Sequence, residues 1–129
     1  FAIVFCLIPL HIKTIEELEL PKALHKLTHL RRGLVLVTGT TGSGKSTTLA
    51  SIIQEINKTY HYHIITIEDP IEYVYNDNKS IIEQRQVGTH TNSFSGALRA
   101  AMREDPDIIV VGEIRDLETA ESILQAVNT

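Results

Sequence analysis

Glycines, a lysine and a serine stand at the spacing of a phosphate-binding loop in the stretch Gly39–Ser46. These residues read Gly-Thr-Thr-Gly-Ser-Gly-Lys-Ser and fit the pattern GxxxxGK[ST]. Glycine backbones can take positive φ angles and approach a ligand closely, so that successive N–H groups point at anionic oxygens. The lysine adds a positive charge, and the serine adds a hydroxyl that suits a magnesium ion. The stretch therefore predicts a cradle for the phosphates of a nucleotide.

The residues that we expect to contact the nucleotide belong to this loop and to the start of the helix after it. They are Gly39, Thr40, Thr41, Gly42, Ser43, Gly44, Lys45, Ser46 and Thr47. The apolar run Leu34–Val37 precedes the loop, and apolar residues recur at helical spacing from Leu49 to Ile56. A strand before the loop and a helix after it form the context that the pattern requires. A glycine-rich turn with an accidental lysine would explain neither element.

Three short apolar runs, mostly of β-branched residues, lie along the chain without alternating polar residues. They are Leu34–Val37, Ile64–Ile67 and Ile108–Val111. Strands covered on both faces have this composition, and helical patterns separate the runs. We therefore expect an α/β fold in which right-handed crossovers build a parallel sheet flanked by helices. Between the second and third runs, Ile71–Tyr75 and Ser80–Val87 flank a turn-like segment and predict a hairpin that projects from the sheet.

Two helices are expected before the first run. Thr14 and Glu17 have the spacing of a capping box, which predicts a short helix. A second helix is expected from Pro21 up to Gly33.

Two more helices are expected in the second half of the chain. Ser93 is the expected N-cap of a helix that Pro106 ends, and Asp116 is the expected N-cap of the last helix. The faces expected to be buried are Phe94, Ala97, Leu98, Ala101 and Met102 in the first of these and Leu117, Ala120, Leu124 and Val127 in the second.

The first ten residues are almost entirely apolar. A membrane helix needs about 20 such residues, and Pro9 interrupts the run. No basic segment precedes it, so the run does not resemble a signal peptide. We expect a buried strand that ends at Pro9. Because the chain begins at Phe1 without a methionine and stops within a helical pattern, we interpret it as part of a longer protein.

Composition limits the classes of function. The chain has 129 residues, enough for one domain, and a net charge of −4 without a block of like charge. A dedicated nucleic-acid binder would more often be basic. The single cysteine, Cys6, cannot form an intrachain disulfide, which suits the cytosol.

His25 and His29 have a spacing that could hold a metal, but no carboxylate or cysteine is arranged to complete a site. We therefore expect both histidines to be surface residues.

Carboxylates follow two of the apolar runs, where ligands bind to open parallel sheets. Glu68, Asp69 and Glu72 follow the second run, and Glu113 follows the third. A nucleotide hydrolase needs such groups to hold magnesium and to position the attacking water. An aspartate commonly follows the run directly, whereas here Gly112 intervenes and a glutamate follows, which suggests contact through water. The alternative is a solvated loop with ordinary surface acids.

Arginines supply the remaining positive charge near these segments. Each could pair with phosphate or a neighbouring subunit, or could be an ordinary exposed charge. They are Arg85, Arg99, Arg103 and Arg115.

Two segments resemble motifs of the secretion ATPases that power type IV pili and type II secretion. Thr66–Glu72 is similar to the Asp box of that family, and Asp105–Asp116 is similar to its atypical Walker B segment. The resemblance implies a RecA-like P-loop NTPase core that binds ATP and Mg²⁺. It implies that Glu72 is the catalytic glutamate and Glu113 the catalytic Walker B glutamate. Ser46 and Glu113 would then be the residues at the metal.

The resemblance also implies an organisation for the whole protein. Residues 1–13 would be the end of a small N-terminal domain and its linker, and residues 14–129 the N-terminal part of the ATPase domain. The full-length protein would form a homo-hexamer that is cytoplasmic, peripheral at the inner membrane, and bound to a pilus or secretion platform protein there. No direct nucleic-acid contact is expected. Because further catalytic groups would lie elsewhere in the ring, we expect the 129 residues alone to be inactive as an ATPase.

The retraction branch of the family is favoured, since Gln84–Val87 and the segment around Met102–Glu104 resemble it. Pilus extension, type II secretion and DNA uptake remain open as other tasks for the same motor. A nucleic-acid translocase is a further alternative, which DNA-stimulated turnover would favour. A nucleotide-binding module that does not hydrolyse ATP is the third.

Overall fold

A three-stranded parallel sheet in the order β2, β1, β3 forms the centre of the computed structural model, which describes residues 1–129. The strands are β1 (His63–Glu68), β2 (Ile81–Gln86) and β3 (Ile108–Val111). The middle strand pairs with both neighbours, so that Ile64 lies beside Ile82 in β2 and beside Ile108 in β3. The prediction of an α/β fold with a parallel sheet is confirmed.

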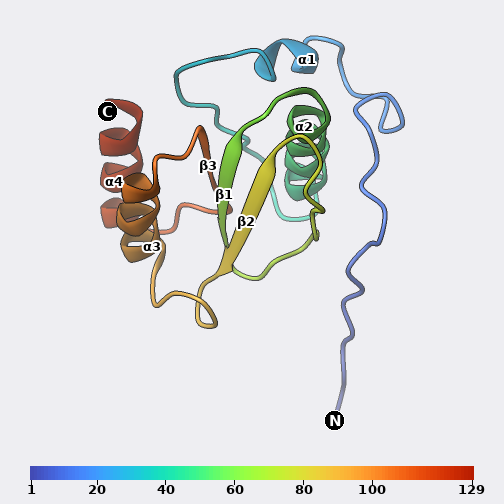
Figure 1. The fold of residues 1–129 in the computed structure, drawn as a ribbon. Coiled ribbons are helices and arrows are strands. Elements are labelled where there is room, and N and C mark those ends of the chain that lie inside the picture. Colours follow the sequence, from blue (N-terminus) through green and yellow to red (C-terminus); the bar gives the residue numbers. More distant parts are fainter.

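Helices cover both faces of this sheet (Figure 1). The first face carries α1 (Leu24–Leu27) and α2 (Lys45–Thr59). The second face carries α3 (Phe94–Ala101) and α4 (Leu117–Val127), with the short 3-10 helix η1 (Met102–Glu104) after α3.

Alternation along β1 sends apolar side chains into two separate cores. Ile64 packs with Ile52 and Ile56 of α2 on one face. Ile67 packs with Leu98 of α3 and Ile123 of α4 on the other. Each fully buried isoleucine stabilises the fold by about 1.5–3 kcal/mol, so β1 is the element that joins both helical layers.

The run Leu34–Val37 is not a strand, and this prediction was wrong. The segment has no assigned secondary structure, and none of the backbone hydrogen bonds in loops involves it. Leu34, Val35 and Leu36 are exposed. Because a strand forms only where a neighbour supplies N–H and C=O partners, β-branched composition alone does not produce one. No strand of the sheet pairs with this run.

The predicted hairpin was also wrong. Ile81–Gln86 is a strand, but it pairs in parallel with β1 rather than with the preceding segment. Ile71–Tyr75 has no strand structure, because side-chain amides of β2 take up some of its backbone groups. Asn57 of α2 holds the turn between the two segments through the backbone N–H groups of Asn78 and Ser80.

The first ten residues contradict the expected buried strand. All of Phe1–Leu10 is exposed without strand structure, and the segment leads away from the sheet (Figure 1). It has no neighbour to pair with.

At the capping box, the N–H of Glu17 donates to Oγ1 of Thr14 at 3.0 Å, but a single turn follows instead of a helix. Glu19, with a positive φ of 53°, ends this turn. The helix expected from Pro21 is reduced to α1.

The two later N-caps are confirmed. Ser93 accepts from the N–H of Gly96, and Asp116 accepts from the N–H of Thr119. The predicted buried face of α3 is correct for Ala97, Leu98 and Ala101, while its ends are half-buried, and the α-helix stops at Ala101, before Pro106.

The buried face predicted for α4 was wrong. Leu117, Leu124 and Val127 are exposed, whereas Thr119, Ser122 and Ile123 are buried. Ile123 packs with Ala97 and Leu98 of α3. Apolar residues lie on more than one side of α4, so the helical period could not show which side packs.

Candidate functional site

The loop Gly39–Gly44 takes the backbone conformation that its glycines predict. Gly39, Gly42 and Gly44 have φ angles of 153°, 79° and 93°. A Cβ at Gly39 would lie 2.6 Å from Oγ of Ser43, so the loop is also too tight for a larger residue there. Gly44 is the N-cap of α2 and has no side-chain cap, which leaves the first N–H groups of this 15-residue helix open to an anion.

The side chain of Lys45 reaches back to the start of this loop. Its Nζ donates to the carbonyl oxygens of Gly39 at 2.9 Å and Thr40 at 2.8 Å. An ammonium has three donors, so one remains for another acceptor. Phosphate oxygens carry charge and accept more strongly than carbonyls. The loop, the lysine and the helix end therefore fit a phosphate group.

The residues after Lys45 lie in the first turn of α2. Ser46 is exposed. Oγ1 of Thr47 forms a hydrogen bond of 2.8 Å with the phenol oxygen of Tyr73, which belongs to the segment after β1. The first turn of α2 is thus joined directly to the segment that carries Glu72.

Glu113 follows β3 and is separated from it by Gly112. The N–H of Gly112 donates to the carbonyl of Ile67 at 2.8 Å, and a Cβ at Gly112 would lie 3.3 Å from that oxygen. The glycine therefore extends the pairing of β3 with β1 by one residue before the chain turns away. This contact is the physical reason for the glycine that stands where the common pattern has an acid.

Glu113 is half-buried and has an incompletely satisfied carboxylate. Its Oε1 lies 2.8 Å from Nη2 of Arg115, yet this buried oxygen has no aligned hydrogen bond. The contact is therefore an ion pair and not an aligned hydrogen bond. Arg115 also lies 3.8 Å from Asp69. One arginine thus draws together the carboxylates that follow β1 and β3.

Glu68 and Glu72 differ in their surroundings. Oε2 of Glu68 accepts from Oγ1 of Thr66 at 2.7 Å and from Nε2 of Gln84 at 3.1 Å, so it belongs to a hydrogen-bond network within the sheet. Glu72 is exposed and makes no side-chain hydrogen bond or ion pair. Nearby, the pKa of the Tyr75 phenol is raised, mainly because the group is buried and secondly because the negative charge of Glu68 lies close to it.

Sequence reasoning missed the glutamines that hold this region. Gln84 and Gln86 alternate along β2 and share one face, and both bind backbone groups of Ile71–Tyr75. Their spacing was visible, but their partners depend on how the segment folds back over the strand.

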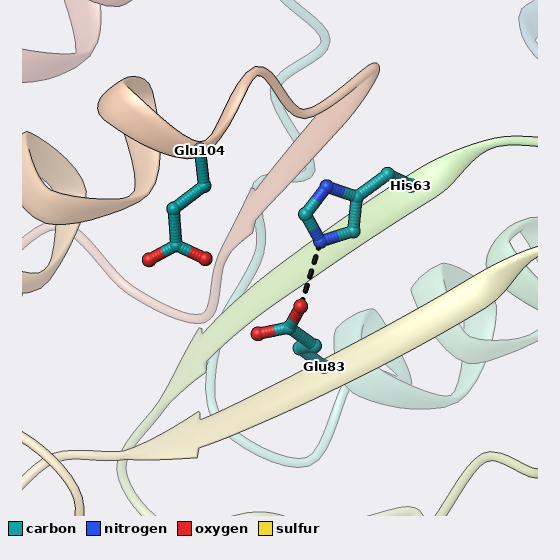
Figure 2. A group of neighbouring side chains, drawn as sticks. All are labelled: His63, Glu83 and Glu104. Carbon is teal, nitrogen blue, oxygen red and sulfur yellow. Dashed lines mark hydrogen bonds and ion pairs between the residues drawn. The ribbon is translucent and has the colours of Figure 1, made fainter.

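A second cluster of titratable groups lies away from this site, at the amino end of β1. His63, Glu83 and Glu104 each bring one possible metal-ligand atom within 4.8 Å of the others (Figure 2). Arg85, however, lies 3.0 Å from Glu83 and donates to both carboxylate oxygens of Glu104, at 2.8 and 2.7 Å. The hydrogen bond with His63, followed by that with Arg85, lowers the pKa of Glu83. The cluster contains its own cation and ties η1 to the sheet.

The other sequence-predicted charges have intrachain partners in most cases. Arg99 pairs with Glu118 at 3.3 Å, whereas Arg103 is exposed without an ion pair. His25 does have carboxylate neighbours, Glu16 at 2.8 Å and Glu55 at 3.4 Å, contrary to the expectation that none was arranged near it. Each nitrogen of His25 contacts a different glutamate, so the histidine links the segment of Glu16 to α2.

No helix of the chain is both long enough and apolar enough to cross a membrane.

Comparisons with known proteins give a consistent result. The type II/IV secretion system protein family matches residues 9–129. The chain is 54% identical over 128 residues to a twitching motility protein of Neisseria gonorrhoeae, covering 99% of this chain and 34% of that protein. It is 53% identical over 126 residues to the type IV pilus retraction ATPase PilT of Pseudomonas aeruginosa, covering 98% and 37%. The chain therefore spans about a third of the length of these curated relatives.

A solved structure is similar over nearly the whole chain. The crystal structure of the pilus retraction motor PilT with bound ADP matches with a TM-score of 0.92 and 60% sequence identity, over 95% of this chain and 36% of that one.

Proposed function

This chain belongs to the type II/IV secretion system protein family, and from that premise we propose that it is part of an ATPase that powers retraction of type IV pili. In the full-length protein it binds ATP with Mg²⁺ and hydrolyses the ATP. The names of the two curated relatives, a twitching motility protein and a pilus retraction ATPase, support retraction as the task. The ADP in the related PilT structure supports nucleotide binding.

The observation that carries the proposal is the geometry around Lys45. Its ammonium lies inside a glycine loop, at the uncapped N-terminus of α2, bonded to the carbonyls of Gly39 and Thr40. Phosphate oxygens would take over these donors on binding. A hydrogen bond to a charged group contributes about 1.5–3 kcal/mol, and the open N–H groups and the helix dipole add to it.

Ser46 and Glu113 are the residues that we propose to hold Mg²⁺. Ser46 is exposed in the first turn of α2, and Glu113 has a buried oxygen without an aligned hydrogen bond. A water of the ion would share the Glu113 carboxylate with Arg115, whose Nη2 lies 2.8 Å from Oε1, and such a contact suits the length and position of the glutamate. When bound, the ion supplies positive charge that offsets the charge of the phosphates.

Glu72 is the proposed general base. As water attacks the terminal phosphorus of ATP, the bond to the ADP oxygen breaks and the water's proton moves to the carboxylate of Glu72. Glu72 has no ion pair or hydrogen bond within the chain, so its carboxylate is available for this transfer.

Assembly and location belong to the proposal for the whole protein. We infer a cytoplasmic homo-hexamer, peripheral at the inner membrane, that acts on a pilus platform protein there. Three of the four arginines considered from the sequence already pair with carboxylates of this chain. They are Arg85, Arg99 and Arg115. Charge developing on the transferred phosphoryl group needs further cations, which a neighbouring subunit would supply.

The test uses the full-length protein and its source bacterium. We expect purified protein to release phosphate from ATP and Lys45→Ala protein to fail. In a strain that lacks the gene, parental protein should restore retraction of labelled pili, whereas the variant should leave pili extended. Absence of ATP hydrolysis by parental protein would refute the proposed activity.

Type II secretion is the second candidate, because the matched family includes both systems. A deletion strain that retracts pili normally but fails to export secreted proteins would favour it. Stimulation of hydrolysis by DNA would instead favour a translocase.

A further inference from the structure

The segment Ile71–Tyr75 lies beside β2 without forming a strand, and its backbone groups are bound by side chains. The N–H of Ile71 donates to Oε1 of Gln86 at 3.0 Å. The carbonyl of Tyr73 accepts from Nε2 of Gln84 at 2.7 Å, and the N–H of Tyr75 donates to Oε1 of Gln84 at 3.0 Å. Side-chain amides thus replace the neighbouring strand that a hairpin would have provided.

Gln84 is the central member of this arrangement. Its single amide binds a carbonyl and an N–H of the segment, on either side of Val74, much as a paired strand would. It sits opposite Thr66 in the β1–β2 register, and the strand backbone therefore fixes the position of its Cα.

The orientation of the Gln84 amide is determined by its partners. Nε2 also donates to Oε2 of Glu68 at 3.1 Å, so the amide nitrogen faces two acceptors and the amide oxygen faces one donor. A flipped amide would place its oxygen against a carboxylate and a carbonyl, and would leave the N–H of Tyr75 without an acceptor. The network therefore permits one orientation.

We propose that Gln84 is a positioning residue for the reaction, one that holds the segment bearing Glu72 at a fixed place above the sheet. Glu72 precedes Tyr73, whose carbonyl Gln84 binds and whose hydroxyl contacts Thr47 beside the nucleotide loop. The partners of Gln84 are Glu68 and the backbone of Tyr73 and Tyr75, so it acts through the segment that it holds. This inference rests on the proposed function, since Glu72 is the group that it positions.

The structure offers a matched control on the same strand. Gln86 holds the segment only through its oxygen, which accepts from Ile71, while its nitrogen donates to Thr89 at 3.2 Å. Glutamate at position 86 keeps the acceptor. Glutamate at position 84 loses both donors and brings a second carboxylate against Glu68. Both changes add a carboxylate near Glu68, which lies opposite Gln86 in the β1–β2 register, but only the change at position 84 removes hydrogen bonds to the segment.

The experiment compares Gln84→Glu, Gln84→Met and Gln86→Glu in the full-length protein. The methionine variant removes the hydrogen bonds without adding charge. Three quantities are measured: kcat for ATP hydrolysis, the Kd for ADP, and hydrogen exchange of the amides of Ile71–Tyr75. A misplaced catalytic group lowers rates by up to about a hundredfold.

For both Gln84 variants we expect kcat to fall by about tenfold to a hundredfold, the Kd to stay within about twofold, and amide exchange in the segment to accelerate. Gln86→Glu should keep all three values near those of the parent. Unchanged kcat in both Gln84 variants would overturn the proposal, as would equal losses of binding and rate, which indicate general disruption.

A parallel Glu72→Gln variant separates this inference from the proposed function. If Glu72→Gln loses turnover while the Gln84 variants retain it, only the positioning role is refuted. If Glu72→Gln retains full turnover, the catalytic assignment of Glu72 is refuted, and the positioning role with it.

Discussion

The phenol oxygen of Tyr73 lies 2.8 Å from Oγ1 of Thr47, and this hydrogen bond joins the segment carrying Glu72 to the helix turn carrying Lys45. Two parts of the site that are far apart in the sequence therefore share a direct contact. A shift of the first turn of α2 on nucleotide binding would be passed to the Glu72 segment through this bond.

Removing that bond with Tyr73→Phe should lower kcat by about twofold to tenfold in the full-length protein, because a neutral hydrogen bond contributes about 0.5–1.5 kcal/mol. The Kd for ATP should change little, since the cradle is untouched. Steady-state kinetics and calorimetry measure the two. Tyr62→Phe is the control, because Tyr62 stacks on Tyr60 and its hydroxyl has no hydrogen-bond partner. Equal kcat for parent and Tyr73→Phe would show that the contact is dispensable.

Lys45→Ala should weaken binding of ADP by about tenfold to 150-fold, which corresponds to the loss of a charged hydrogen bond of about 1.5–3 kcal/mol. Titration calorimetry of the full-length protein measures this. Lys58→Ala is the matched control, since Lys58 is an exposed lysine in the last turn of the same helix. The phosphate cradle would be wrongly assigned if both variants bound ADP as tightly as the parent.

Glu72→Gln and Glu113→Gln should lower kcat by about a hundredfold or more while leaving the Kd for ATP near the parental value. An amide keeps the shape of the side chain, but at position 72 it cannot accept the proton and at position 113 it holds hydrated magnesium poorly. Glu121→Gln, which changes an exposed residue on α4, should leave both quantities unchanged. Should either site variant keep parental turnover, its residue loses the proposed role, and Glu68 or Asp69 becomes the next candidate.

The cluster around Glu83 should make stability depend on pH. Contacts with His63 and Arg85 lower the pKa of Glu83 below its usual 4.5, so the folded state binds fewer protons than the unfolded state there. The stabilisation is present above pH 4.5 and is lost as the pH falls through the folded-state pKa. The difference in Tm between the parent and Glu83→Gln should therefore be largest above that pH and shrink below it.

Thermal unfolding from pH 3 to 7 measures this dependence in the full-length protein. The effect should be small, since 43% of the Glu83 side chain is exposed and solvent screens its charge. Glu121→Gln, without an ion pair, is the control. A constant difference between parent and Glu83→Gln across the range would contradict the assignment.

Short-range patterns predicted the parts of the fold that depend on neighbours in the chain. The glycine spacing of the loop, the helix that begins at Lys45 and the N-caps Ser93 and Asp116 are all present. Each involves residues a few positions apart, whose interactions require no partner from elsewhere. The roles of Glu72 and Glu113, by contrast, stay predictions until they are measured.

Patterns that require a distant partner were predicted less well. Leu34–Val37 has a composition typical of a strand, yet no neighbour pairs with it. Ser80–Val87 was correctly seen to contain a strand, but its partner is β1 and not the segment before it. In α4, apolar residues at helical spacing are exposed, and the buried side carries Thr119, Ser122 and Ile123, of which Ile123 packs with Leu98 of α3.

By itself, the sequence determined the glycine loop and the helix after it, because backbone conformation at glycines and helix starts is set by local sterics and hydrogen bonds. Its buried apolar runs, separated by helical patterns, also predicted the α/β fold. The tertiary structure alone decided which strands pair, which face of α4 is buried, and how the Glu72 segment is held. Gln84 meets Glu68, Tyr73 and Tyr75 only because a parallel pairing brings β2 beside β1 and the intervening segment folds back over them. Such contacts depend on loop closure and packing, which no spacing along the chain encodes.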